Sequence, residues 1–268
     1  RSYMAKFLSE DELMEALKQT ASNLRQEGKL KFKGFSQNSL NHYGNLMKNG
    51  LNLDSYHETK DTYHQEVKPQ LLALMSDISD IISEFDSGFN DEPSKMIGNP
   101  CPHGNPRSYA WASMTRSGRD RRNDLQFFVS LKREFLRFGI YVGSRWGADR
   151  FNQVIRSIHS DSEHFMELIR EARGSGYSLD THRDDYIDDG STMLLELNSR
   201  SPHVSIGEHG HFHLVRGISL SELRKLKSEE VLDSALHAFV HTRRMYEFCL
   251  KKHVPLKFRL LEDINSRR

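Results

Sequence analysis

Hydrophobic positions in the first third of the chain recur every three or four residues, the period of an amphipathic helix. Ser9 and Ser36 each precede such a run and are candidate N-caps. Pro69 interrupts the longest run, so that helix either kinks there or restarts with the proline in its first turn. We therefore expect helices at residues 9–27, 36–48 and 55–85.

The period changes to two after a segment rich in proline and glycine, residues 86–106, which we expect to be a loop. Alternating apolar and polar residues then predict three strands, at residues 109–114, 125–131 and 136–142. Short polar connections favour an antiparallel meander, with a longer basic loop, residues 116–124, joining its first two strands.

Helical spacing returns at residues 148–159 and 163–173, and again at the end of the chain, at 219–226 and 228–252. Residues 193–197 and 209–215 are candidates for further strands. This order predicts an α+β fold, with a single domain in which helices flank an antiparallel sheet. We divide the chain into an N-terminal helix (1–30), the α+β domain (31–255) and a C-terminal tail or linker (256–268).

Composition excludes several classes of protein. Only 37% of the residues are hydrophobic, and the longest apolar runs are far shorter than the roughly 18 residues that a membrane span needs. No charged-then-apolar signal segment opens the chain. Cys101 and Cys249 are the two cysteines, too few for a disulfide framework or a zinc knuckle. We therefore expect a cytoplasmic protein that does not act at a membrane.

Catalytic signatures are absent from the sequence. Its one Gly-Lys pair, Gly28-Lys29, has Asn23 where a phosphate-binding P-loop needs its first glycine. The serine nucleophile elbow, the His-Glu-x-x-His metalloprotease motif and the Gly-x-Gly-x-x-Gly dinucleotide motif are also missing. The sequence therefore favours a non-catalytic chain without a cofactor, although the absence of motifs leaves enzymatic activity open.

Charge is unevenly distributed, although the net charge of the whole chain is only +1. Residues 107–156 carry a net charge of +7, and residues 161–200 carry −6. Such a separation is a reason to look for an anionic partner of the basic surface. A charged segment is, however, more often just a face exposed to solvent.

The basic loop is the most suggestive local feature. Its candidate phosphate-binding residues are Arg116, Arg119, Arg121 and Arg122. The planar guanidinium group matches phosphate oxygens well, and Trp111 and Trp146 could provide stacking surfaces for bases. In the competing interpretation, acids of the loop, Asp120 and Asp124, pair with the arginines and the tryptophans belong to the core.

A histidine-rich segment from His203 to His213 raises the possibility of a metal site, together with the acids between Asp184 and Asp189. On a strand, His209, His211 and His213 would lie on one face. We favour the simpler interpretation, an exposed edge strand with polar alternation, because zinc ligands usually occur at tighter spacings. The sequence therefore predicts no metal ligand.

Several segments resemble a known family. Residues Ser108 to Ser113, the loop from Arg116 to Arg122, and residues 124–129 and 135–143 resemble the N-terminal specificity region of McrB-like AAA+ GTPases. These GTPases are the motor subunits of modification-dependent restriction systems.

A second, overlapping similarity is to a bacterial family of uncharacterised α+β proteins. It rests on Phe35-Ser36, on Tyr56 to Lys60, on Tyr63, Val67 and Pro69, and on Arg216-Gly217 with the basic stretch after it. Together the two resemblances cover most of the chain from Phe35 to Phe248.

The first resemblance implies a DNA-binding module of an antiviral restriction system, acting with an AAA+ GTPase motor and a nuclease subunit. It also implies DNA with a modified base as a candidate ligand, flipped into an aromatic pocket. Tyr109, Trp111, Tyr141 and Trp146 are the aromatic candidates. The alternatives are a metal-dependent hydrolase that uses the His203 to His213 region, and a protein-interaction scaffold.

Overall fold

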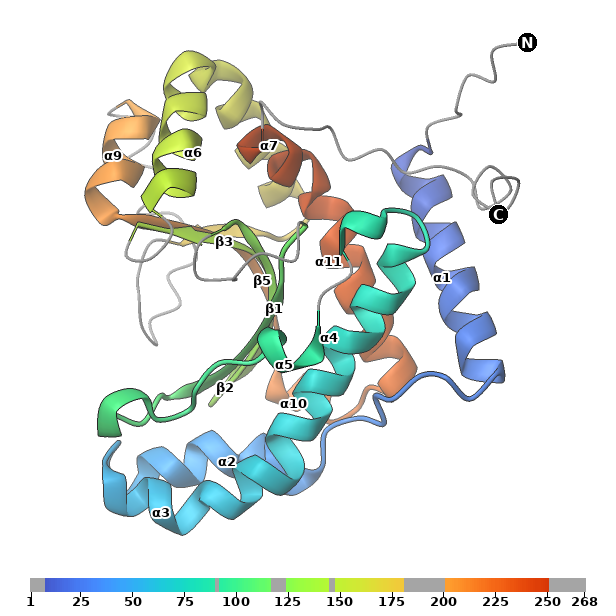
Figure 1. Cartoon of the computed structure of the whole chain (residues 1–268), viewed down its shortest axis with the longest axis vertical. Coiled ribbons are helices and arrows are strands. Elements are labelled where there is room, and N and C mark those ends of the chain that lie inside the picture. The colour runs from blue at the N-terminus through green and yellow to red at the C-terminus, as the bar shows by residue number, and fades with distance from the viewer. Residues whose placement is uncertain (1–7, 90–91, 117–123, 145–147, 181–200, 251–268) are drawn as a thin grey trace.

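The protein has an α+β fold built on one five-stranded antiparallel sheet (Figure 1). The computed structural model describes residues 8–89, 92–116, 124–144, 148–180 and 201–250. The strands lie in the order β1-β2-β3-β5-β4. Their bounds are Tyr109–Met114 (β1), Gln126–Lys132 (β2), Phe135–Gly143 (β3), Ser178–Asp180 (β4) and His211–Ser219 (β5).

Helices precede the sheet, follow its third strand and close the described part of the chain. The α-helices are α1 (Glu10–Gln26), α2 (Gln37–Lys48), α3 (Leu53–Thr62), α4 (Lys68–Ser83), α5 (Pro93–Met96), α6 (Ala148–Ser160), α7 (Ser162–Gly174), α9 (Pro202–His209), α10 (Leu220–Leu223) and α11 (Ser228–Cys249). A π-helical turn, Tyr63–Val67, joins α3 to α4, and short 3-10 turns lie at Ser87–Phe89 and Pro102–Gly104. Within these residues, no helix is both long and apolar enough to cross a bilayer.

Most predicted elements are confirmed within one or two residues. Pro69 lies in the first turn of α4, directly after the π-helical turn; the backbone keeps helical angles at Tyr63, Val67 and Lys68, so the helix continues through this turn instead of ending and starting again. The first predicted strand coincides with β1, and β2 and β3 differ from their predictions by one residue at each end. Helix α1 contributes Leu13 and Leu17 to the same core as the sheet. The strand predicted at 193–197 and the boundary predicted at residue 256 lie outside the described residues.

Two elements predicted in the second half of the chain are present but have different bounds. The strand predicted at 209–215 is displaced to His211–Ser219, because His209 is the last residue of α9 and Gly210 ends that helix with a positive φ of 75°. The helix predicted at 219–226 is limited to Leu220–Leu223. Strand β4 has only three residues, too few for a periodic pattern to predict it.

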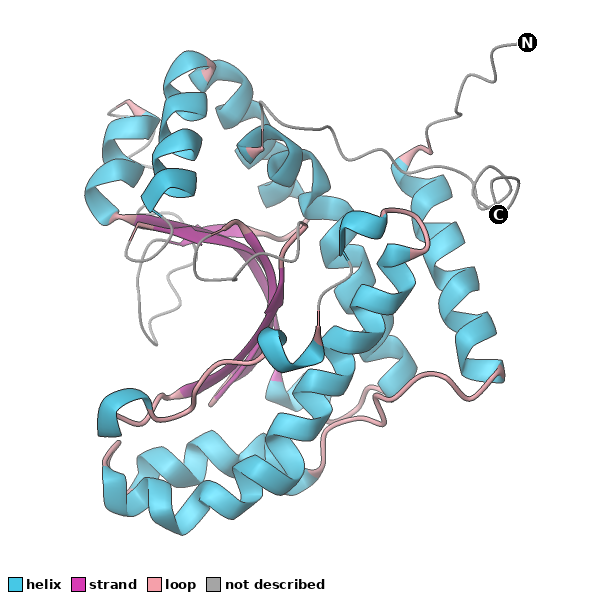
Figure 2. Cartoon of the chain, viewed as in Figure 1, coloured by secondary structure: helices cyan, strands magenta, loops and turns pink. Residues whose placement is uncertain are grey.

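Strong curvature divides the sheet into a convex and a concave face (Figure 2). The convex face packs on α4 and α11, and the described helices lie beyond this face and the two ends of the sheet. Strands β3 and β5 approach each other closely at Gly139, in the middle of β3. A Cβ atom on this residue would lie only 1.9 Å from the carbonyl oxygen of Leu214 in β5. A residue with any side chain would therefore force β3 and β5 apart.

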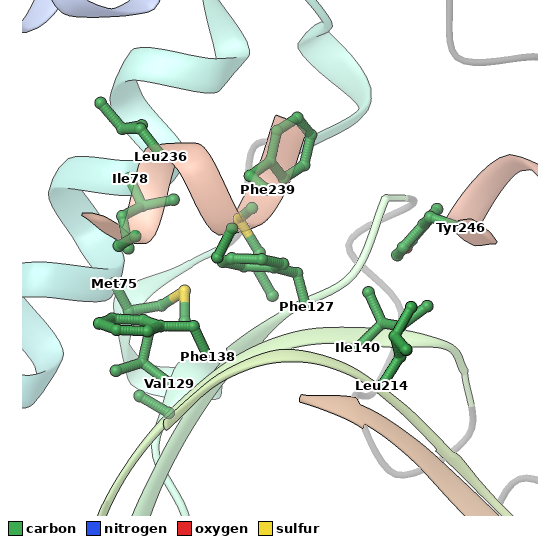
Figure 3. Close-up of a cluster of buried hydrophobic side chains, with 14 of the residues drawn as sticks. Met75, Ile78, Phe127, Val129, Phe138, Ile140, Leu214, Leu236, Phe239 and Tyr246 are labelled. Carbon is green, nitrogen blue, oxygen red and sulfur yellow. The ribbon is translucent and has the colours of Figure 1, made fainter. Parts of the chain in front are cut away.

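The core lies between the convex face of the sheet and helices α4 and α11 (Figure 3). Alternate residues of three neighbouring strands point into it, and all are almost fully buried: Phe127, Val129, Phe138, Ile140 and Leu214. They meet Met75 and Ile78 of α4 and Leu236 and Phe239 of α11. Because side chains alternate along a strand, the residues between these five point to the concave face.

Candidate nucleic-acid interface

The concave face carries aromatic and polar side chains on four adjacent strands. Strand register places Trp111 opposite Ser130, and Ser130 opposite Arg137. Two residues further along β1, Ser113 pairs with Phe128 of β2. Tyr141 of β3 lies between its two partners, Gln126 of β2 and His213 of β5. Paired residues of antiparallel strands share a face, so residues distant in sequence form one surface here.

Aromatic rings form a continuous cluster across this surface, which we call the concave aromatic cluster: Trp111, Phe128, Tyr141, His211 and His213. Trp111 stacks on Phe128 with ring centroids 4.1 Å apart and an interplanar angle of 12°. Tyr141 stacks on His213 at 4.6 Å, and its ring meets the edge of Trp111 at 5.4 Å. The cluster therefore spans β1, β2, β3 and β5.

The rings are fixed in place but not fully covered. Trp111 donates a hydrogen bond from Nε1 to Oε1 of Gln126 at 2.9 Å, which sets the orientation of the indole. Trp111 and Tyr141 are half-buried, whereas Phe128 beneath Trp111 is fully buried. No described helix or strand covers the concave face (Figure 2). A held, partly exposed aromatic ring is a suitable platform for stacking a planar ligand.

Cations lie at one end of the cluster, around Tyr109. The guanidinium of Arg107 lies 5.5 Å from the centre of the Tyr109 ring and donates to its hydroxyl, and Nζ of Lys132 lies 5.9 Å from the same ring. Arg137 belongs to the same face, opposite Ser130. Arg107 is exposed, whereas Lys132 and Arg137 are mostly buried. The face therefore combines rings with positive charge.

Two serine hydroxyls of the concave face, on Ser113 and Ser130, are buried and have no hydrogen-bond partner within the described part of the chain. Ser130 pairs with Trp111, and Ser113 pairs with Phe128. Buried hydroxyl groups normally find a partner. Two hydroxyl groups without a partner among the described residues therefore lie next to the stacked rings of Trp111 and Phe128.

The predicted phosphate-binding residues fall into two groups. Arg116 is described, and its Nε lies 3.1 Å from Oδ2 of Asp86, a nearly buried carboxylate between α4 and the 3-10 turn Ser87–Phe89. Arg119, Arg121, Arg122 and Trp146 lie outside the described residues. Trp111 lies in the concave aromatic cluster, with Tyr109 and Tyr141 as ring neighbours.

The two ends of the basic loop, before residue 117 and after residue 123, are anchored to the core. Tyr246 of α11 accepts a hydrogen bond from the backbone N–H of Arg116 at 3.2 Å and donates one to the carbonyl oxygen of Leu125 at 3.1 Å. Nε of Arg150 in α6 lies 2.5 Å from Oδ1 of Asp124, in a nearly buried ion pair. Burial raises the pKa of the Tyr246 hydroxyl well above its usual value, so the group stays protonated and can donate.

The histidine-rich segment differs from the prediction. Strand β5 lies between β3 and β4 and is not an edge strand, and His211 and His213 are buried. Local alternation correctly placed these two residues on one face but could not reveal the order of strands. Among the described residues, no three histidine, cysteine or acidic side chains are grouped to hold a metal ion. The acids between Asp184 and Asp189 lie outside those residues.

Sequence reasoning did not bring Arg107, Lys132, Arg137 and Phe128 into the candidate site. Alternation within β1 does place Tyr109 and Trp111 on one face, but only the register of β2 and β3 adds Phe128, Lys132 and Arg137. Arg107 is added by its contact with the ring of Tyr109. A scan of the sequence against models of known protein families finds no match, and a search of curated proteins finds none either.

Proposed function

We propose that this chain is a non-catalytic DNA-binding module whose concave face receives a base. The observation that carries the proposal is the concave aromatic cluster with cations at its end. Trp111 and Tyr141 offer partly exposed rings, and Arg107 offers an exposed guanidinium at the end of the same face.

Stacking provides the affinity for the base. Each base stacked on an aromatic ring contributes about 1–3 kcal/mol, and an arginine or lysine near the ring pairs with the neighbouring phosphate.

A base inside a duplex cannot lie flat against a concave sheet, so the ligand is either single-stranded DNA or a base turned out of the duplex. Turning a base out of the duplex costs the least free energy when the base is mismatched or damaged. We further propose that a modified base is the preferred ligand and that the module serves a restriction or defence system with a GTPase motor and a nuclease. This part rests on the resemblance of residues 108–143 to the McrB-like specificity region.

The test is a fluorescence anisotropy titration with single strands and with unmodified, methylated and hydroxymethylated duplexes, each at two salt concentrations. We expect single strands or modified duplexes to bind most tightly. We expect Trp111→Leu to weaken binding by about tenfold or more, the equivalent of one lost stacking contact. Arg107→Gln should weaken binding of every DNA and reduce the slope against log salt by about one.

Arg170→Gln is the matched control, because Arg170 is exposed on α7, a helix that packs against α11 beyond the convex face. It removes the same charge and should leave binding unchanged. The proposal is wrong if no DNA binds at low salt, or if Arg107→Gln and Arg170→Gln weaken binding equally. Metal content measured on the same preparation tests the hydrolase alternative, since a metalloenzyme should retain about one equivalent.

A further inference from the structure

A cavity lies between α2, α10 and the start of α11, away from the concave face. These helices lie in the lower part of the molecule in Figure 1. Its volume is about 320 Å³, at the lower end of the range typical of small-molecule sites. The residues that matter most for its chemistry are Lys33, Phe35, Leu223, Arg224, Lys227 and Val231.

The lining of this cavity is positively charged. Lys33, Arg224 and Lys227 contribute three cations, and no acidic residue is among the described residues that line it. Its floor is apolar, because Leu223 and Val231 are buried. An anionic group bound here would meet positive charge on the rim, while the remainder of the ligand contacts apolar side chains.

Two of the three cations are already held in position by the protein. Arg224 donates from Nη2 to Oδ1 of Asn41 at 2.8 Å, and Nζ of Lys33 donates to the carbonyl oxygen of Leu30 at 3.2 Å. These partners are neutral, so they orient the cations without neutralising them. Orienting a side chain beforehand reduces the entropy that a ligand must remove on binding.

We propose that this cavity binds a phosphate group, with Arg224, Lys227 and Lys33 as its ligands. The guanidinium of Arg224 can bind two phosphate oxygens at once, and the lysines add point charges. The volume admits a small organic phosphate of about mononucleotide size. The same chemistry fits a backbone phosphate of DNA, and the experiment separates these two sources.

The experiment is isothermal titration calorimetry of the whole chain with inorganic phosphate, ribose 5-phosphate and AMP, with adenosine as the uncharged control. We expect the phosphate compounds to bind and adenosine not to bind. The double variant Arg224→Gln/Lys227→Gln should weaken phosphate binding at least about tenfold, because each charged hydrogen bond is worth that much or more. Both side chains are exposed, so the variant should fold normally.

Controls separate this proposal from the proposed function. Trp111→Leu and Arg170→Gln should bind the phosphate compounds as the parent chain does, even if no DNA binds. If the free phosphates fail to bind but the double variant weakens duplex binding, the occupant is a DNA phosphate, and the assignment of the cavity stands. The proposal is refuted if neither free phosphates nor DNA respond to the double variant.

Discussion

Tyr246 offers a direct test of how the basic loop is anchored. The variant Tyr246→Phe keeps the buried ring but removes the hydroxyl that joins the N–H of Arg116 to the carbonyl of Leu125. Both hydrogen bonds disappear, and both backbone groups lose a partner at a position where the tyrosine is almost completely buried.

The magnitude follows from those two bonds. A hydrogen bond contributes about 0.5–1.5 kcal/mol net, so losing two should lower the free energy of unfolding by about 1–3 kcal/mol. Urea unfolding followed by circular dichroism measures this as a lower midpoint with an unchanged slope.

Tyr43→Phe is the matched control. Tyr43 is equally buried, but its hydroxyl has no hydrogen-bond partner in the described part of the chain. Removing an unsatisfied buried hydroxyl should leave stability unchanged or raise it slightly. The reasoning is refuted if Tyr43→Phe costs as much as Tyr246→Phe, because ring packing and not the hydrogen bonds would then explain both losses.

Two further predictions concern the fold. Gly139→Ala should lower the free energy of unfolding by about 3 kcal/mol or more, or prevent folding, because its Cβ would overlap the carbonyl of Leu214. The control is Gly207→Ala on α9, where an added Cβ would meet no atom within 4 Å. In the same urea assay it should be neutral or stabilising by up to about 1 kcal/mol. Burial lowers the pKa of His42 from 6.5 to about 4, so the folded state keeps it neutral and stability should fall as the pH drops from 6.5 towards 4. Between pH 7 and pH 5 this loss should reach about 2 kcal/mol, and His42→Leu should reduce the pH dependence by that amount; an equally steep dependence in the variant would contradict the assignment.

Local patterns were sufficient to predict most of the individual elements. The strand β1 was predicted from alternation alone, since Ala110, Ala112 and Met114 alternate with larger or polar residues that face the other way. Pro69 marked an irregularity in the long helix, because it lacks the N–H that a helix interior requires, and the π-helical turn lies directly before α4.

Strand order and curvature could not be predicted in this way. The central position of β5 depends on its pairing with β3, whose partner residues lie 68 to 84 positions earlier, and nothing in the sequence of either strand specifies that partner. The meeting of Trp111 with Tyr141 likewise depends on the register of three strands. The role of Gly139 becomes visible only when the backbone of β5 lies beside it.

The most direct test of the central claim, that DNA binds the concave face, is photocrosslinking with DNA that carries 5-bromouracil, followed by mass spectrometry of the crosslinked peptides. The account predicts crosslinks to Trp111 or Tyr141, lost in Trp111→Leu or Tyr141→Leu respectively. Crosslinks confined to helices beyond the convex face, such as α7 or α11, would contradict it.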